Sequence, residues 1–195
     1  IRDRIYLMKE YKLPIGCDVP ETIILADGDF PSHPLALEWL RQCPYVVCCD
    51  GAANTYIRSG RMPEAIVGDG DSLLPDIKER YASLIHSEAE QEINDLSKAF
   101  RFCLSQERKR ITIMGATGKR EDHTIGNVSL LADYMEQAEV SMMTDYGIFV
   151  PIREDSMFES YIGQQISVFN MNSTALSAEG LAYPLSVFTL SLLHI

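Results

Sequence analysis

The sequence predicts an α/β fold, with a helix-covered parallel sheet in its N-terminal part and a smaller all-β part after it. Two observations predict this. Up to about residue 138, short apolar runs alternate with segments of helical spacing, as in strands that are buried on both faces beneath helices. From about Glu139 onward, strand-like runs are joined by turns with no helical pattern between them, which indicates a second, all-β module. We place the two domains at residues 1–144 and 145–195.

The elements follow in chain order. Residues 1–21 are mixed and contain the breakers Pro14 and Pro20, so we expect a leader or an edge element there. The strands after it are short apolar, β-rich runs, and the helices carry apolar residues three or four positions apart. The first domain then has expected strands at 22–26, 45–49, 65–67, 84–86 and 110–114 and expected helices at 34–42, 52–58, 75–81, 94–107 and 122–136, and further strands are expected at 140–144, 147–152, 165–170 and 185–190.

Composition limits the functional classes. The chain has 195 residues, 46% of them hydrophobic, which is enough for one or two domains. Its 17 basic and 28 acidic residues give a formal net charge of -11, which disfavours nucleic acid but allows a small anionic ligand held through metal ions. Five cysteines without a C-x-x-C pair are typical of reduced thiols. Since no membrane span and no signal peptide is recognisable either, we expect a cytoplasmic protein that does not contact a membrane.

Acidic turns follow three of the expected strands. They are Asp27-Gly28-Asp29, Asp50-Gly51 and Gly68-Asp69-Gly70-Asp71. Each Asp-Gly pair alone is typical of a simple turn. The carboxyl ends of parallel strands meet at one edge of a sheet, however, and clustered carboxylates repel one another unless a cation lies between them. We therefore predict a magnesium site at this edge, with Asp69 and Asp71 as ligands.

Two further segments place charges near helix starts. In Glu90 to Lys98, Asn94 is a helix cap, and Asp95 and Lys98 share one helix face, either as a solvated ion pair or as a metal ligand and a phosphate contact. The segment 115–124 follows a buried strand and offers glycines, two cations and a helix start. It is not a Walker A loop, but it suits a polyphosphate. Taken singly, Asp122 is equally consistent with a helix cap and His123 with a surface residue.

Four segments together resemble a known family. They are CDGAAN at 49–54, GDGDSL at 68–73, EQEINDLSKA at 90–99 and GATGKREDHTIGN at 115–127. In this order and at these intervals they resemble the thiamin pyrophosphokinases over roughly residues 22–150, and Gly180 to Leu185 is similar to a segment that opens the family's last strands. The resemblance implies a Rossmann-like nucleotide-binding domain, a thiamin-binding β-sandwich domain, and a homodimer with the active site at or near its interface. It also implies that pyrophosphate passes from ATP to thiamin with Mg²⁺, giving thiamin diphosphate and AMP.

The resemblance also implies roles for individual residues. Gln91 matches a position that contacts thiamin from the dimer partner, and we assign Asn94 to substrate binding with it. Asp71 and Asp95 are the alternatives for the group that accepts or orients the hydroxyl proton. The implied metal positions are Asp50, Asp69, Asp71 and Asp95, and the implied nucleotide positions are Asp50, Lys98, Thr117, Arg120, Asp122 and His123.

The chain departs from the family pattern at several places. Glu90 stands where the family often has Asp, Asn94 where Thr is common, and Gly70 where an aromatic residue is frequent, so we expect a more flexible metal turn. The sequence also stops at Ile195, before the strands that complete the family's thiamin pocket. We therefore expect the β domain to be incomplete as it stands, or diverged. Two other functions remain open, a metal-dependent phosphohydrolase that uses the same acidic edge and a non-catalytic nucleotide-binding module.

Overall fold

The structure is a computed structural model, and its contacts divide the chain into two compact units. One unit is Pro14–Glu154, and the other combines Ile1–Leu13 with Asp155–Ile195. The structure describes residues 8–14, 18–88, 90, 93–171, 176–183, 185–188 and 193–194. These units divide the chain at other positions than the expected domain boundary, which stays a prediction.

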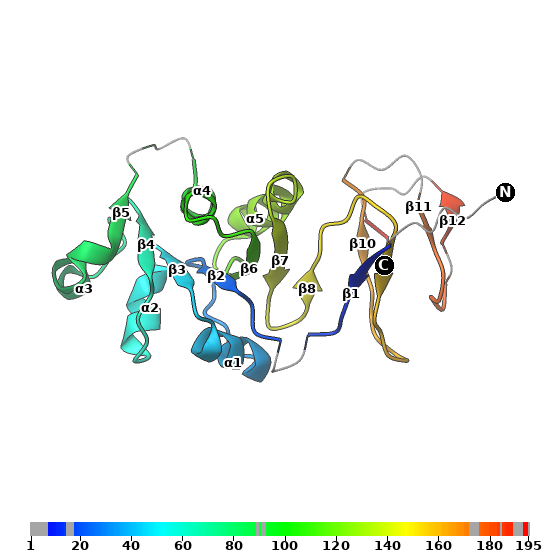
Figure 1. Cartoon of the computed structure of the whole chain (residues 1–195), viewed down its shortest axis with the longest axis horizontal. Coiled ribbons are helices and arrows are strands. Elements are labelled where there is room, and N and C mark those ends of the chain that lie inside the picture. The colour runs from blue at the N-terminus through cyan, green and yellow to red at the C-terminus, as the bar shows by residue number, and fades with distance from the viewer. Residues whose placement is uncertain are drawn as a thin grey trace. The chain divides into compact units, whose positions relative to one another are not determined.

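A seven-stranded sheet forms the centre of the larger unit (Figure 1). All neighbouring strands in it are parallel except the last pair, in which Met142 lies opposite Phe149 in an antiparallel register. The predicted parallel-dominated α/β architecture is therefore confirmed. In spatial order the strands are β5 (Ile85–Ser87), β4 (Ala65–Gly68), β3 (Val46–Cys49), β2 (Thr22–Leu25), β6 (Arg110–Met114), β7 (Glu139–Met143) and β8 (Ile148–Phe149).

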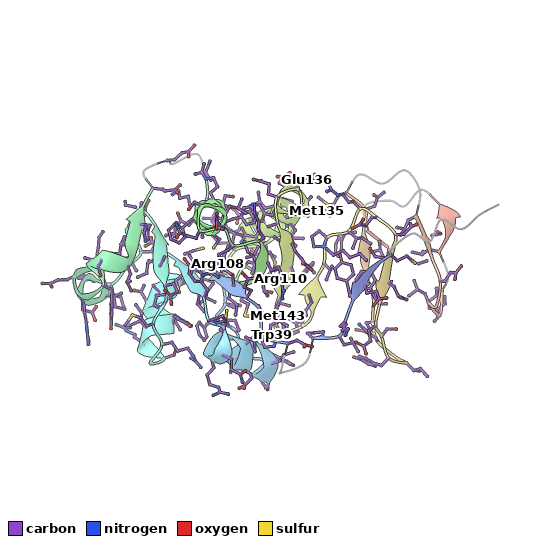
Figure 2. All side chains as sticks on the ribbon, in the orientation of Figure 1. Trp39, Arg108, Arg110, Met135, Glu136 and Met143 are labelled. Atoms are coloured by element: carbon purple, nitrogen blue, oxygen red, sulfur yellow. The ribbon has the colours of Figure 1, made fainter. Side chains whose placement is uncertain are left out.

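Helices cover both faces of this sheet (Figure 1). Successive residues of β2 point to opposite faces, so that Ile24 joins the apolar core beneath α4 and α5, and Ile23 and Leu25 join the core beneath the other helices. Trp39 and Met143 belong to this second core (Figure 2). The helices are α1 (Pro34–Gln42), α2 (Ala52–Arg58), α3 (Pro75–Arg80), α4 (Asp95–Ser105) and α5 (Glu121–Tyr134), and a 3-10 turn, η1, spans Ala82–Leu84.

The expected helices and strands of this unit are present with bounds that shift by a few residues. One expectation is corrected. The strand-like runs at 140–144 and 147–152 were assigned to an all-β module, but they form β7 and β8, which extend the large sheet. The reason is that the chain crosses over from β6 through α5 to β7, which pairs in parallel with β6. The alternation of strands and helices therefore continues one strand further than the sequence pattern indicates.

The strand order creates one point in the sheet where the direction of the chain reverses. From β2 the chain moves outward through β3, β4 and β5, and then returns to place β6 on the other side of β2. In open parallel sheets, the crevice outside the carboxyl ends of the strands at such a switch point is the preferred place for a ligand. The loops after β2, β3, β4 and β6 therefore define the region in which to look for a site.

The smaller unit consists of short paired strands. In β1 (Lys9–Tyr11), the ring of Tyr11 stacks on Phe158 of β9 (Ser156–Phe158), with ring centroids 4.7 Å apart. The strand expected at 165–170 is present in shortened form as β10 (Val168–Phe169), and the strand expected at 185–190 is present as β12 (Leu185–Phe188), with residues 189–190 outside the described residues. The other pairs are antiparallel and join β10 (Val168–Phe169) to β13 (Leu193–His194) and β11 (Leu176–Ala178) to β12 (Leu185–Phe188).

None of the helices in the described part of the chain has the length and apolar character needed to cross a membrane. The described cysteines have free thiols, with Cys48, Cys49 and Cys103 buried and Cys43 half-buried.

Candidate active site

Three carboxylates converge at the carboxyl edge of the large sheet. Asp50 follows β3, and Asp69 and Asp71 follow β4. One oxygen from each lies within 4.8 Å of the other two. The predicted meeting of these aspartates at one edge is therefore observed, and we call Asp50, Asp69 and Asp71 the acidic cluster.

Asp50 is the buried member of the cluster. Only 3% of the residue is exposed, and its backbone has a φ of 25°, a conformation that non-glycine residues rarely adopt. Its Oδ2 accepts a hydrogen bond of 3.1 Å from the backbone N–H of Ser72. Its Oδ1 is buried and finds no hydrogen-bond partner among the residues that the structure describes. Since buried polar atoms are almost always paired, and no described protein group pairs this oxygen, it is available to coordinate a cation.

The other two carboxylates are held by a tight turn after β4. The backbone N–H of Asp71 donates to Asp69 Oδ1 at 3.2 Å, and Ser72 Oγ donates to Asp71 Oδ1 at 3.0 Å. Gly70 between them has a φ of 75°, which glycine adopts without strain. Both carboxylates are exposed, so a dissolved cation can reach them.

The pKa values reflect this asymmetry. Burial, together with the acidic groups of Asp71, Asp95 and Asp69, raises the pKa of Asp50 to about 6, and the hydrogen bond from Ser72 offsets only part of that rise. The hydrogen bond that the Ser72 hydroxyl donates to the Asp71 carboxylate is the main reason that the pKa of Asp71 lies below its usual range. Without a cation, the cluster therefore retains a proton on Asp50 at mildly acidic pH.

The cluster fits a magnesium ion. Carboxylate oxygens are the hard ligands that Mg²⁺ prefers, and this ion commonly uses one or two of them together with waters and phosphate oxygens. The unpaired Oδ1 of Asp50 and the two solvent-accessible carboxylates supply such a set. A divalent cation would also offset the repulsion that raises the pKa of Asp50.

Asp95, which was also predicted as a metal ligand, lies beside the cluster without joining it. It is the first residue of α4, and its Oδ1 accepts a hydrogen bond of 2.9 Å from Lys98 Nζ. The Lys98 side chain is only 5% exposed, so this pair is not the solvated one that the sequence allowed. Burial lowers the pKa of Lys98, but the hydrogen bond and charge of Asp95, with Asp69 nearby, outweigh it and raise the pKa. A charged Lys98 is therefore fixed next to the acidic cluster.

Of the two residues predicted to bind substrate, Asn94 and Gln91, the structure describes only Asn94. Asn94 caps α4 as predicted, with its side chain accepting a hydrogen bond of 2.9 Å from the N–H of Ser97. Its role in substrate binding stays a prediction. Gln91 lies outside the described residues.

Two glycine-containing loops interlock beside the cluster, one after β2 and one after β6. The backbone N–H groups of Gly28 and Asp29 donate to Gly115 O at 2.6 Å and Thr117 O at 2.8 Å. A Cβ at Gly28 would lie 2.3 Å from Thr117 O, so only glycine fits there. Of the predicted nucleotide-site residues, Thr117 therefore holds the loops together through its carbonyl.

The charged side chains of the second loop are paired with one another or with the first loop. Lys119 Nζ donates to Asp27 Oδ1 at 3.0 Å. Arg120 forms an exposed ion pair of 2.5 Å with Asp122, which holds the pKa of Asp122 at about 2. Arg120 rather than Asp122 occupies the N-cap position of α5, without a capping hydrogen bond from its side chain, and His123 is exposed in the first turn of this helix. The cations of this loop are therefore accessible but not free.

A small hollow of about 130 Å³ opens between the first loop and α2. Gly51 lies close to both Asp27, which lines the hollow, and Ser72, which binds the acidic cluster, because a Cβ on Gly51 would lie 2.5 Å from Asp27 Oδ2 and 3.2 Å from Ser72 Cβ. The hollow is lined by Ala26, Asp27, Gly28, Asp29, Phe30, Ala52, Thr55 and Lys119.

The sequence does not predict Ser72 as part of the site, and it predicts Lys119 only as one of the two cations of the segment 115–124, not as the partner of Asp27. Ser72 binds two of the cluster carboxylates, and its signal was its place directly after Asp71 in the GDGDSL segment. The pairing of Lys119 with Asp27 spans 92 residues and leaves no local signal.

The fold and this edge define a class of protein: an α/β protein with an acidic cluster that could hold a metal ion and a glycine-containing loop suited to phosphate. Comparison with protein families identifies it further. Residues 36–143 match the model for "Thiamin pyrophosphokinase, catalytic domain", and residues 147–191 match "Thiamin pyrophosphokinase, substrate-binding domain". The chain belongs to the thiamin pyrophosphokinase family, as its sequence motifs predicted.

Curated relatives with this name are similar over about half of their length. Thiamine pyrophosphokinase 1 of Oryza sativa subsp. japonica is 29% identical, covering 53% of this chain and 49% of that protein. Thiamin pyrophosphokinase 1 of Caenorhabditis elegans is 30% identical, covering 52% and 45%. The chain therefore spans about half the length of the curated relatives that it matches.

Solved structures agree on the fold. The crystal structure of yeast thiamin pyrophosphokinase has a TM-score of 0.57 at 18% identity, over 74% of this chain and 67% of that one. Thiamine pyrophosphokinase from Bacillus subtilis has a TM-score of 0.53 at 25% identity, over 63% of this chain and 60% of that one.

Proposed function

We propose that this chain transfers the pyrophosphoryl group of ATP to the hydroxyl of thiamin, giving thiamin diphosphate and AMP. Membership of the family supports this proposal. The observation that carries it is the acidic cluster, in which the buried Oδ1 of Asp50 lacks a partner beside two exposed carboxylates. A triphosphate cannot approach three such groups without a cation, and a triphosphate with Mg²⁺ supplies one.

The chemistry requires alignment and charge neutralisation more than covalent catalysis. The thiamin oxygen forms a bond to the β-phosphorus, the bond from that phosphorus to the oxygen bridging the α-phosphate breaks, and AMP leaves with the electron pair. Asp50, Asp69 and Asp71 would hold the magnesium ion, which supplies Lewis-acid stabilisation of the phosphate oxygens. Asp95 extends the acidic edge toward α4, and Asp71 or Asp95 accepts the hydroxyl proton.

The nucleotide occupies the edge between the acidic cluster and the loop after β6. Lys98 lies beside the cluster and meets a phosphate there. Arg120 exchanges its contact with Asp122 for a second phosphate, and Asp50, Thr117, Asp122 and His123 complete the predicted nucleotide contacts. The hollow beside Gly51 supports this arrangement, since it continues the edge from the cluster toward the loop after β2.

We assign thiamin to the other part of the chain. In this proposal residues 1–144 form a Rossmann-like nucleotide domain and residues 145–195 a β-sandwich that binds thiamin, with Gln91 and Asn94 contributing from the motif before α4. A homodimer would bring Gln91 to the partner's site. The match of residues 147–191 to a substrate-binding domain supports this division, and the free thiols of the described cysteines support a cytoplasmic setting.

The test is a product analysis. The chain is incubated with ATP, Mg²⁺ and thiamin, and the mixture is separated to measure AMP and thiamin diphosphate, with Asp71→Asn as the matched inactive variant. Equal amounts of both products, formed only with thiamin present, support the proposal. Phosphate release without thiamin would indicate a phosphohydrolase. Thermal stabilisation by ATP without any AMP would indicate a nucleotide-binding module.

A further inference from the structure

Asn54 links the two segments that carry the acidic cluster. It lies on α2, one turn after Asp50, and it is half-buried. Its Nδ2 donates a hydrogen bond of 2.8 Å to Ser72 O, and its Oδ1 accepts one of 3.0 Å from the N–H of Leu74. Both partners are backbone groups of the loop after β4, which also carries Asp69 and Asp71.

This pattern needs a carboxamide. A side chain at this position has to donate to a carbonyl and accept from an N–H group two residues further on, and Asn is the shortest side chain that does so from two separate atoms, whereas the single oxygen of Ser or Thr would have to reach both. The two contacts also fix which end of the amide is oxygen. An aspartate would place an oxygen against Ser72 O, and an alanine would leave both backbone groups of the loop without their partner.

Leu73 of this loop is buried in the apolar core, so its side chain anchors the end of the loop, but few other hydrogen bonds among the described residues hold the part that carries Asp69 and Asp71. Lys78 Nζ donates to Gly70 O at 2.7 Å, and the Ser72 N–H binds Asp50 Oδ2 at 3.1 Å. Asp50 itself is tied to α2, because its carbonyl accepts the first N–H of the helix turn, from Ala53, at 3.0 Å. Asn54 therefore connects the helix start that fixes Asp50 to the loop that carries the other two carboxylates.

We propose that Asn54 is a positioning residue that sets the spacing of Asp50, Asp69 and Asp71 for their cation. This inference rests on the proposed metal site. Groups that orient metal ligands without touching the metal typically contribute about 10–100-fold to metal affinity. Loss of Asn54 allows the loop to move away from Asp50 and weakens cation binding, while the sheet and its core are unaffected.

The test compares Mn²⁺ binding, measured by electron paramagnetic resonance on the full chain at pH 7.5, in wild type and three variants. We expect Asn54→Ala to bind Mn²⁺ about tenfold more weakly. Asn54→Asp gives the sharper result, because it adds a negative charge near the cluster. Electrostatics alone would tighten cation binding in this variant, and lost positioning weakens it. Asn127→Ala is the matched control, since Asn127 Nδ2 binds Ala116 O at 2.9 Å in the loop after β6.

The outcomes separate the two proposals. Weaker Mn²⁺ binding in both Asn54 variants and wild-type binding in Asn127→Ala support the inference. Wild-type or tighter binding in Asn54→Asp would overturn it while leaving the metal site intact. If the wild-type chain binds no Mn²⁺, the metal site itself is wrong and the inference falls with it. Thermal unfolding of each variant shows whether it is folded.

Discussion

The loop after β4 and the loop after β6 lie at the same edge of one sheet, yet the carboxylates of the first form no ion pairs with described cations, whereas the cations of the second are paired with carboxylates. In the first, Asp69 and Asp71 meet the buried Asp50, and no cation of the described residues forms an ion pair with any of the three. In the second, Lys119 pairs with Asp27 and Arg120 pairs with Asp122.

The difference indicates which loop requires a ligand and which only accommodates one. The acidic cluster contains a buried oxygen without a partner and a carboxyl group with a raised pKa, both of which a bound cation relieves. The basic loop is already neutralised by its own carboxylates, so an incoming phosphate has to displace them. Exposed ion pairs of this kind contribute little to stability, so a phosphate can replace the carboxylate partner of Lys119 or Arg120 with little loss of free energy.

The largest expected effect is on turnover. Asp71→Asn keeps the size of the side chain but removes a charge from the acidic cluster, so we expect a loss on the order of 100-fold or more in the rate of AMP formation. The fold remains intact because Asp71 is exposed. Initial rates with saturating ATP and thiamin measure this. Near-normal turnover in Asp71→Asn would remove Asp71 from the mechanism.

The next effect is on stability and depends on pH. The pKa of Asp50 is raised to about 6 in the folded chain, so the folded state binds this proton more tightly than the unfolded state does. Ionisation of Asp50 therefore lowers the free energy of unfolding. This destabilisation is absent below the unfolded pKa of about 4 and is fully present above pH 6. In the presence of EDTA, we expect Asp50→Asn to raise the free energy of unfolding by about 1–2 kcal/mol at pH 7.5.

Urea denaturation at two pH values checks this second expectation. At pH 4 the difference between Asp50→Asn and wild type should become small, because the wild-type carboxyl group is then largely protonated. An equal difference at both pH values would show that ionisation of Asp50 is not its cause.

A smaller effect is expected from the basic loop. Arg120→Ala removes a cation that the nucleotide recruits from Asp122, so we expect the KM for ATP to rise about tenfold with a smaller change in kcat. Because the pair is exposed, the unfolding temperature should stay the same. Steady-state kinetics with varied ATP measures the split. A loss of kcat alone would place Arg120 at the reacting phosphorus instead.

Much of this arrangement could be predicted from the sequence. The apolar runs and their glycine turns locate the strands of the large sheet, and parallel strands bring Asp50, Asp69 and Asp71 to one edge whatever the details of packing. The helix spacing also predicts that Asp95 and Lys98 share a face.

Other features depend on contacts that the sequence does not reveal. The burial of Lys98 follows from how α4 packs on the sheet, whereas the sequence leaves open whether Lys98 and Asp95 form a solvated pair or contact a phosphate and a metal ion. The interlock of Gly28 with Gly115 is a backbone contact between distant segments. The strands β9, β11 and β13 have two or three residues each, too few for a recognisable alternation.

The most direct test of this comparison is cation binding by single carboxylate variants, one from the acidic cluster and one from the loop after β6. Mn²⁺ is titrated into wild type, Asp50→Asn and Asp122→Asn at pH 7.5 without nucleotide, and free Mn²⁺ is measured by electron paramagnetic resonance. We expect wild type and Asp122→Asn to bind one Mn²⁺ with the same affinity and Asp50→Asn to lose this binding. Equal Mn²⁺ binding in wild type and Asp50→Asn would contradict the assignment of the acidic cluster as the metal site.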